Sequence, residues 1–149
     1  MVGSITAAEL RRRYQAGEEI AIVDAREEGV FHDRHLLMAS CLPLSRLELL
    51  APSLLPRRSV PIVVCDAGEG LAARAASRLA AGGYSDVSVL DGGVEAWETA
   101  GYPVYSGVHV PSKAFAERQG ALHEPDKHRG TIRNCLVIRA RPQHLRWRV

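Results

Sequence analysis

Residues 61–83 read PIVVCDAGEGLAARAASRLAAGG: an apolar run, a loop containing two glycines, and an alanine-rich stretch. The run at 61–65 is short and apolar, which is typical of a buried strand. After the loop, Leu71, Ala75 and Leu79 share one helical face, and the glycine pair 82–83 predicts the end of that helix. This stretch therefore predicts a strand that ends at Cys65, followed by a turn and a helix.

Two more apolar runs predict strands, at 20–26 (IAIVDAR) and 86–90 (DVSVL). A helix is predicted over 4–17, where Thr6 caps the first amides, Glu9 reaches back to Thr6, and Gly17 ends the helix.

Further helices are predicted at 44–55, from leucines at helical spacing, and at 92–101, closed by Gly101. Strands that alternate with helices at this spacing pair in parallel through right-handed crossovers. The sequence therefore predicts a three-layer α/β/α sandwich around a mainly parallel sheet. Reactive groups of such sheets collect beyond the carboxyl ends of the strands, which is where Cys65 falls.

The amino-acid composition limits which class of protein this chain can belong to. The 149 residues are 46% hydrophobic and 24% charged, which suits a single globular core. No apolar run approaches the roughly 18 residues that cross a bilayer, and the first residues lack the order of a secretory signal, so we expect a cytoplasmic protein without a membrane partner. Cysteines 41, 65 and 135 are widely spaced, which favours reduced thiols over a disulfide framework or a zinc site.

The distribution of charged residues divides the chain into two parts. Residues 1–126 hold 12 Lys and Arg against all 17 Asp and Glu, whereas residues 127–149 hold seven Lys and Arg and no acid. We expect a domain over 1–105, a connector over 106–126 and a basic C-terminal tail over 127–149. The tail is open to three roles: an added edge strand, contact with RNA or an acidic protein surface, or an unfolded segment. A basic tail without a recognition fold favours a structural or solvated role, so no nucleic-acid partner is expected.

The position of Cys65 leaves two interpretations open. A loop that joins a strand to a helix N-terminus can aim several backbone amides at one point, where aligned peptide dipoles add about half a positive charge. Such a site lowers a cysteine pKa and favours the thiolate, which is the attacking form. Alternatively, Cys65 is a small buried hydrophobe that finishes a strand.

Several segments together resemble the rhodanese (sulfurtransferase) family. They are, in chain order, Asp24-Ala-Arg26-Glu27, Phe31-x-x-x-His35-Leu36 followed by Ala39-Ser40, Cys65-x-x-Gly68, and Asp91-Gly92-Gly93-x-x-x-Trp97-x-x-x-Gly101-x-Pro103. Each is weak alone, but their order and spacing are specific, and they span residues 4–104. The stretch GVHVPSKAFAE resembles the connector of proteins that string several rhodanese domains together, so relatives are expected to carry further such domains.

The resemblance implies a function. In that family a cysteine takes a sulfane sulfur from a donor, becomes a persulfide and passes the sulfur to cyanide or a thiol. Cys65 is then the nucleophile, and no metal or organic cofactor is required. The partners are a small-molecule or protein-bound donor and a thiol acceptor. The amides that cradle the sulfur, and so bind substrate, belong to Asp66, Ala67, Gly68, Glu69, Gly70 and Leu71.

The loop departs from the family pattern. Active members commonly carry Arg or Lys at the fifth position after the cysteine, where this chain has Gly70, and Asp66 and Glu69 add negative charge. Carboxylates near a thiol raise its pKa and repel an anionic donor. We therefore expect a sulfurtransferase that is not optimised for thiosulfate. The alternative is a catalytically weak module that binds or regulates a partner. A phosphatase is disfavoured, since the resemblance implies that phosphatase loops are one residue longer and carry an arginine.

The remaining motif residues have structural interpretations. The resemblance implies that Asp24 and Arg26 tie the strand end to neighbouring loops, and that His35 is hydrogen-bonded scaffold. Trp97 is expected to pack against the sheet. Cys41 is expected in or near the core, and it becomes a candidate resolving thiol only if it lies close to Cys65.

Overall fold

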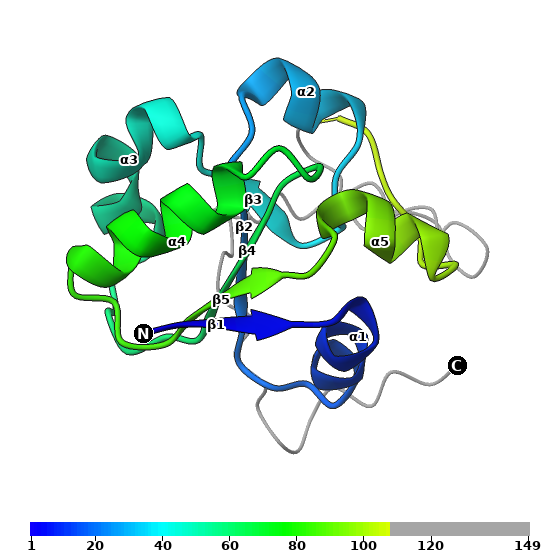
Figure 1. The fold of residues 1–149 in the computed structure, drawn as a ribbon, viewed down its shortest axis with the longest axis horizontal. Helices are drawn as coiled ribbons and strands as arrows, with labels where there is room; N and C mark the ends of the chain where they lie inside the picture. Colours follow the sequence, from blue (N-terminus) through cyan, green and yellow to red (C-terminus); the bar gives the residue numbers. More distant parts are fainter. Residues whose placement is uncertain (108–149) are drawn as a thin grey trace, which may run out of the picture.

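A five-stranded parallel sheet organises the part of the chain that the computed structural model describes, residues 1–107. The strand order is β1-β5-β4-β2-β3 (Figure 1), so the strand before the cysteine loop lies at the centre. All pairings are parallel, as the alternating pattern predicts. The strands are β1 Val2–Ile5, β2 Ala21–Asp24, β3 Ala39–Cys41, β4 Ile62–Cys65 and β5 Val87–Leu90.

Helices cover both faces of this sheet. In Figure 1, α3 and α4 lie to the left of the strands and α1 and α5 to the right, which confirms the three-layer α/β/α arrangement. Each layer has its own hydrophobic cluster, one centred on α3 and α4 and the other on α1 and α5. The helices are α1 Ala7–Gln15, α2 Glu28–Asp33, α3 Leu47–Leu54, α4 Leu71–Ala81 and α5 Gly93–Thr99, with a short 3-10 helix, η1, at Leu44–Arg46.

The predicted helix ends are mostly confirmed. The Thr6 hydroxyl accepts a hydrogen bond from the Glu9 amide at 3.2 Å, and Gly17 takes a positive φ of 72° just after α1. The expectation that the Glu9 side chain reaches back to Thr6 is wrong. Its carboxylate instead binds Arg12 and Arg13, because residues three and four positions apart face each other on a helix.

Three elements were not predicted: β1, α2 and β3. The β1 strand contains exposed Gly3 and Ser4, so it lacks a continuous apolar run. Helix α2 has only six residues and one buried side chain, Phe31. The β3 strand has three residues, none of them fully buried. All three are edge or connecting elements whose conformation depends on tertiary contacts rather than on local pattern.

The predicted domain over 1–105 lies within the described residues, and its boundary stays a prediction. The connector over 106–126 and the tail over 127–149 lie outside them, except for residues 106 and 107, and Cys135 falls in that tail. Among residues 1–107, no helix has both the length and the apolar character needed to span a membrane.

Candidate functional site

The carboxyl ends of the three central strands bring Cys41, Asp24 and Cys65 into one row. Asp24 of β2 is in register with Cys41 of β3 on one side and with Cys65 of β4 on the other. The two cysteines are therefore two strand spacings apart, about 9.6 Å. Because a disulfide needs Cα atoms within about 7 Å, this geometry excludes Cys41 as a resolving thiol for Cys65.

Cys65 is the last residue of β4 and is completely enclosed. Its side chain has 0% exposure and belongs to the hydrophobic cluster of the α1 and α5 layer. The thiol donates a hydrogen bond to the carbonyl oxygen of Val23, at 3.4 Å. Burial raises the pKa of Cys65 well above its ordinary value, and the nearby Asp24 carboxylate raises it further against the opposing effect of Arg26. The folded protein therefore holds Cys65 as a neutral thiol.

The carboxylate of Asp66 joins the loop to the start of α4 through two backbone amides. One oxygen, Oδ1, accepts a hydrogen bond from the Gly68 amide, and the other, Oδ2, accepts one from the Ala72 amide in the first turn of α4, both at 2.9 Å. Asp66 is only 5% exposed. The N-terminus of α4 thus already has an anionic partner, supplied by the protein itself through the Ala72 amide.

Backbone contacts hold Asp66 in this place. The Val94 amide of α5 donates to the Asp66 carbonyl oxygen at 2.7 Å. Gly93 approaches so closely that a Cβ atom there would stand 2.1 Å from the same oxygen. On the other side, Gly68 and Gly70 both adopt positive φ, at 90° and 80°, which lets the loop curl around the carboxylate.

The expected cradle around the Cys65 sulfur is therefore not found. The loop begins at Asp66, as predicted, but the Gly68 amide of the loop and the Ala72 amide of α4 donate to the Asp66 carboxylate, and the Cys65 thiol donates to the Val23 carbonyl oxygen. Cys65 is still part of the strand, so its side chain is directed into the helix layer and not into the turn. Of the six predicted substrate-binding residues, Asp66 is buried, Ala67 and Leu71 are half-buried, and Gly68, Glu69 and Gly70 are exposed.

Sequence reasoning missed the structural role of Asp66. It treated this residue as a charge that disfavours substrate, whereas the carboxylate closes the turn. The signal was present, because an Asp two residues before a glycine commonly binds backbone amides ahead of it in an Asx turn. The contribution of Ala72 carries no sequence signal, since only its backbone amide takes part.

The Asp24 and Arg26 pair has the structural role that was expected. Two nitrogens of the Arg26 guanidinium donate to the two Asp24 carboxylate oxygens, at 2.9 and 2.6 Å, and both side chains are almost fully buried. The same guanidinium donates to the carbonyl oxygen of Arg34 at 2.6 Å. These bonds tie the end of β2 to the segment after α2, and they engage the guanidinium with protein acceptors.

His35 and Trp97 also serve as scaffold. Each ring nitrogen of His35 lies 2.8 Å from a carbonyl oxygen, one of Leu36 and one of Gly107, and the ring stacks on Phe31. Trp97 is 6% exposed and donates from its indole nitrogen to the Pro103 carbonyl oxygen at 3.0 Å. The His35 ring joins segments far apart in the chain, and the Trp97 indole ties α5 to the segment that follows it.

Cys41 is half-buried, and its thiol contacts the Arg26 carbonyl oxygen. Burial raises the pKa of Cys41 to about 12. Within residues 1–107, no group of three or more His, Cys, Asp and Glu side chains is placed to hold a metal ion. The described site thus combines neutral thiols with a carboxylate fixed by backbone amides.

Comparisons with known proteins agree with this architecture. The sequence profile of the rhodanese-like domain matches residues 6–100. A crystal structure of a thiosulfate sulfurtransferase from Pseudomonas aeruginosa is 47% identical, with a TM-score of 0.77 over 83% of this chain and 24% of that one. The rhodanese-like domain of a protein from Anabaena is 28% identical, with a TM-score of 0.65 over 89% of this chain and 94% of that one.

A curated relative, an HTH-type transcriptional regulator of Mycobacterium tuberculosis, is 33% identical over 107 residues, which make up 72% of this chain and 46% of that protein. The chain spans about half the length of the curated relatives that it matches. Since the profile covers most of the described residues and the parallel sheet agrees with it, the chain belongs to the rhodanese-like domain family.

Proposed function

We propose that this rhodanese-like domain is a binding or regulatory module that does not carry sulfur on Cys65. The observation that supports this most directly is that the carboxylate of Asp66, and not the sulfur of Cys65, accepts hydrogen bonds from backbone amides. The Asp66 carboxylate accepts the amides of Gly68 and Ala72, while the Cys65 thiol is fully enclosed and donates to a strand carbonyl.

The chemistry of sulfur transfer makes this arrangement unfavourable. A thiolate must attack the outer sulfur of a donor such as thiosulfate, so that a new S–S bond forms on cysteine, the donor S–S bond breaks, and sulfite leaves with the electron pair. This step requires an ionised cysteine and access of the donor to its sulfur. Cys65 meets neither requirement, because burial raises its pKa and keeps it neutral, and its side chain has 0% exposure.

The charges of the loop also disfavour sulfur transfer from an anionic donor. Asp66 already occupies the amides that would otherwise receive an anion, and Glu69 adds an exposed carboxylate. Position 70 is a glycine and offers no cation. An anionic donor would therefore meet like charges where a sulfur-transfer loop needs positive potential.

The relatives support a role in larger assemblies. The matching transcriptional regulator contains this domain as less than half of its length. The thiosulfate sulfurtransferase is matched over only 24% of its chain, so the activity in its name is that of a much longer protein. A rhodanese-like domain that acts beside other domains is consistent with both.

The decisive experiment treats the full chain with thiosulfate or a polysulfide and measures the mass of the Cys65 peptide, and a parallel assay adds cyanide as the sulfur acceptor and measures thiocyanate. We expect no persulfide on Cys65 and no thiocyanate formation above the level of a Cys65→Ser control. As a matched positive control, the double variant Cys65→Ala/Asp66→Cys places a thiol at the position that receives the Gly68 and Ala72 amides. This variant is expected to gain a persulfide at position 66. A persulfide on Cys65 of the wild type, lost in Cys65→Ser, contradicts the proposal.

A second candidate is sulfur transfer through Cys65. It is favoured by the 47% identity to part of a thiosulfate sulfurtransferase and by the cysteine at the end of the central strand. This function requires an opening that exposes the thiol. The same mass measurement distinguishes the two candidates, because only the second gives a persulfide on the wild-type protein.

A further inference from the structure

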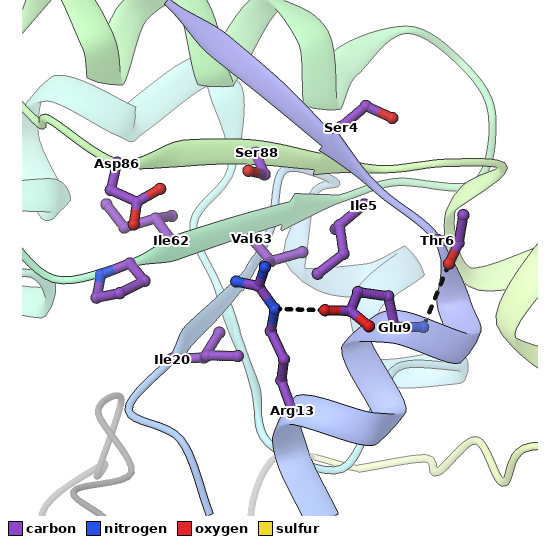
Figure 2. Close-up of a pocket in the computed structure, with 11 residues that line it drawn as sticks. Ser4, Ile5, Thr6, Glu9, Arg13, Ile20, Ile62, Val63, Asp86 and Ser88 are labelled. Atoms are coloured by element: carbon purple, nitrogen blue, oxygen red, sulfur yellow. Dashed lines mark hydrogen bonds and ion pairs between the residues drawn. The ribbon is translucent and has the colours of Figure 1, made fainter. Parts of the chain in front are cut away.

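Access to Cys65 depends on the elements that enclose it, because the cavity beside α1 does not reach the thiol. That cavity has a volume of about 220 Å³, and Figure 2 shows the Arg13 side chain bound to Glu9 in its lining. Neither Cys65 nor any residue of the loop after it lines this cavity. Since the Cys65 side chain has 0% exposure, a reagent reaches the thiol only after a part of the enclosure moves.

Parts of the chain that are far apart in sequence form this enclosure. Cys65 shares its hydrophobic cluster with Leu36, which lies between α2 and β3, and with Val94 and Trp97 of α5. The strand that carries Cys65, β4, is paired on both sides, with β2 and with β5. Because pairing fixes the strand, an opening has to come from the segment around Leu36 or from α5.

Residues 102–107, here called the exit strap, connect these two parts. Figure 1 shows the strap leaving α5 and running up to α2. At the α5 end, the Trp97 indole nitrogen donates to the Pro103 carbonyl oxygen at 3.0 Å. At the α2 end, His35 and Tyr105 exchange two backbone hydrogen bonds, each at 2.8 Å, in an isolated antiparallel bridge. One short segment thus fastens both movable parts of the enclosure.

Further contacts hold the strap against the domain. The Gly107 amide donates to the His32 carbonyl oxygen at 2.8 Å, and the Gly107 carbonyl oxygen lies 2.8 Å from Nε2 of the His35 ring. Between these bonds and α5, the Val104 side chain packs against the cluster that contains Cys65. The strap therefore takes part in the enclosure with a side chain of its own, besides fastening the other parts.

The strap is also the least deeply packed part of the enclosure. Its residues Pro103 and Ser106 are exposed, and Tyr102, Val104 and Tyr105 are only half-buried. The cluster residues of α5 and of the segment before β3 are buried. Segments with few buried apolar contacts and with hydrogen bonds near solvent open at a lower free energy than the whole domain unfolds. This difference in packing favours release of the strap before any strand of the sheet separates.

We propose that the exit strap is a gate for Cys65. The docked strap closes the enclosure of the thiol, and the released strap exposes the thiol while the sheet stays folded. Any binding event that captures the strap therefore controls access to Cys65. This inference goes beyond the proposed function, because it concerns access to the thiol and holds whether or not an exposed Cys65 takes up sulfur.

A matched pair of substitutions in the full chain tests the gate. Tyr105→Pro removes the amide that donates to His35, whereas Tyr105→Ala removes the side chain and keeps the amide. Ala75→Gly, at a buried position of α4 in the opposite helix layer, lowers the stability of the whole domain and leaves the strap unchanged. Mass spectrometry of the Cys65 peptide after timed treatment with iodoacetamide gives each rate, and urea denaturation gives each free energy of unfolding.

Modification through global unfolding follows the free energy of unfolding, whereas modification through the gate does not. We expect Tyr105→Pro to react at least tenfold faster than Ala75→Gly after both rates are corrected for the unfolded fraction, and at least threefold faster than Tyr105→Ala. Equal corrected rates for Tyr105→Pro and Ala75→Gly overturn the proposal. A persulfide measurement on the wild type tests the proposed function separately, because alkylation reports only access to the thiol.

The urea dependence of the same reaction supplies a second readout. Local opening exposes little surface, so the rate for Tyr105→Pro should stay nearly constant up to about 1 M urea. The rate for Ala75→Gly should rise with the slope of global unfolding. Parallel slopes for the two variants overturn the gate. Should Tyr105→Pro fail to fold, Val104→Ser, which weakens the apolar contact of the strap, replaces it in both comparisons.

Discussion

The neutral state of Cys65 follows from its complete enclosure. Its sulfur touches the Val23 carbonyl oxygen and the apolar side chains of the α1 and α5 layer, and water has no access to it. A thiolate in this place would lose its hydration without gaining the loop amides, which bind Asp66.

Alkylation therefore reports on Cys65 directly. We predict that iodoacetamide leaves Cys65 unmodified in the folded protein between about pH 7 and 9, although a free cysteine with a pKa of about 8.5 reacts readily in this range. Mass spectrometry of peptides after timed quenching gives the rate, and the same protein in denaturant gives the reference. A native rate close to the denatured rate contradicts the enclosed geometry.

Asp66 contributes to stability through its two backbone partners. Replacing it with alanine leaves the amides of Gly68 and Ala72 without their acceptor, and the Ala72 amide is buried. We predict that Asp66→Ala lowers the free energy of unfolding by about 1–3 kcal/mol. Asp66→Asn, which keeps one oxygen acceptor, should lose less. Urea denaturation of the three proteins measures the difference, and equal stability of all three excludes a structural role for the carboxylate.

The positions of Cys65 and Asp66 mark the limit of sequence reasoning at this scale. The sequence placed a cysteine, an acidic residue and glycines at the end of the central strand, and this is confirmed. The strand end itself was predicted correctly, at Cys65. Successive side chains of a strand point to opposite faces, and which of the two residues accepts the backbone amides depends on packing against α5, which the local sequence does not encode.

At the scale of elements, the start of α5 is pressed against the loop after β4. The Val94 amide binds the Asp66 carbonyl oxygen, and Gly93 gives the two segments room to meet. The glycine pair in the Gly-Gly-x-x-x-Trp motif is thereby explained by close backbone approach together with positive φ at both positions.

A glycine comparison tests this junction. Gly93→Ala introduces a Cβ atom 2.1 Å from the Asp66 carbonyl oxygen at a φ of 60°, whereas Gly101→Ala, at a φ of 85°, meets nothing within 4 Å. We predict a loss of about 1–2 kcal/mol for Gly101→Ala, from backbone strain alone. Gly93→Ala should lose a further amount of about 1–3 kcal/mol from the clash. Thermal unfolding gives both values, and equal losses contradict the close approach.

The elements that sequence reasoning found are those with their own local pattern. Strands β2, β4 and β5 are apolar runs, and α1, α4 and α5 carry caps or terminal glycines. The 44–55 segment is helical, but it begins as the 3-10 turn η1, which leucine spacing does not distinguish. The missed elements, β1, α2 and β3, are held by pairing and packing with distant parts of the chain.

At the scale of the whole molecule, two cysteine thiols and the phenol of a tyrosine make the stability of the fold depend on pH. Burial raises the pKa values of Cys65, Cys41 and Tyr84, so the folded protein retains protons that the unfolded chain releases above about pH 8.5–10. Raising the pH through this range therefore favours unfolding. Glu9 has the opposite effect on the pH dependence of stability, since hydrogen bonds from Arg12 and Arg13 lower its pKa to about 2. Its contribution is lost as the pH falls from about 4.5 towards 2.

We therefore predict a plateau of stability between about pH 5 and 8, with a decline on the alkaline side. Cys65→Ala removes one of the groups responsible, so its stability should decline less steeply than that of the wild type above pH 9, from a lower plateau. Urea midpoints measured across the pH range test this. Parallel alkaline slopes for the two proteins contradict the assignment of a raised pKa to Cys65.

The strand order has a consequence for how the chain folds. The β1 strand precedes the other four strands in the chain, yet within residues 1–107 it pairs only with β5, the last of them, since Val2 lies opposite Val87. An edge formed by such distant residues closes late, after the ends of a long loop have met, and topologies dominated by distant pairings fold slowly. During synthesis, a ribosome that has not yet released β5 holds an unfinished sheet, whose unpaired β4 edge requires protection until β5 emerges.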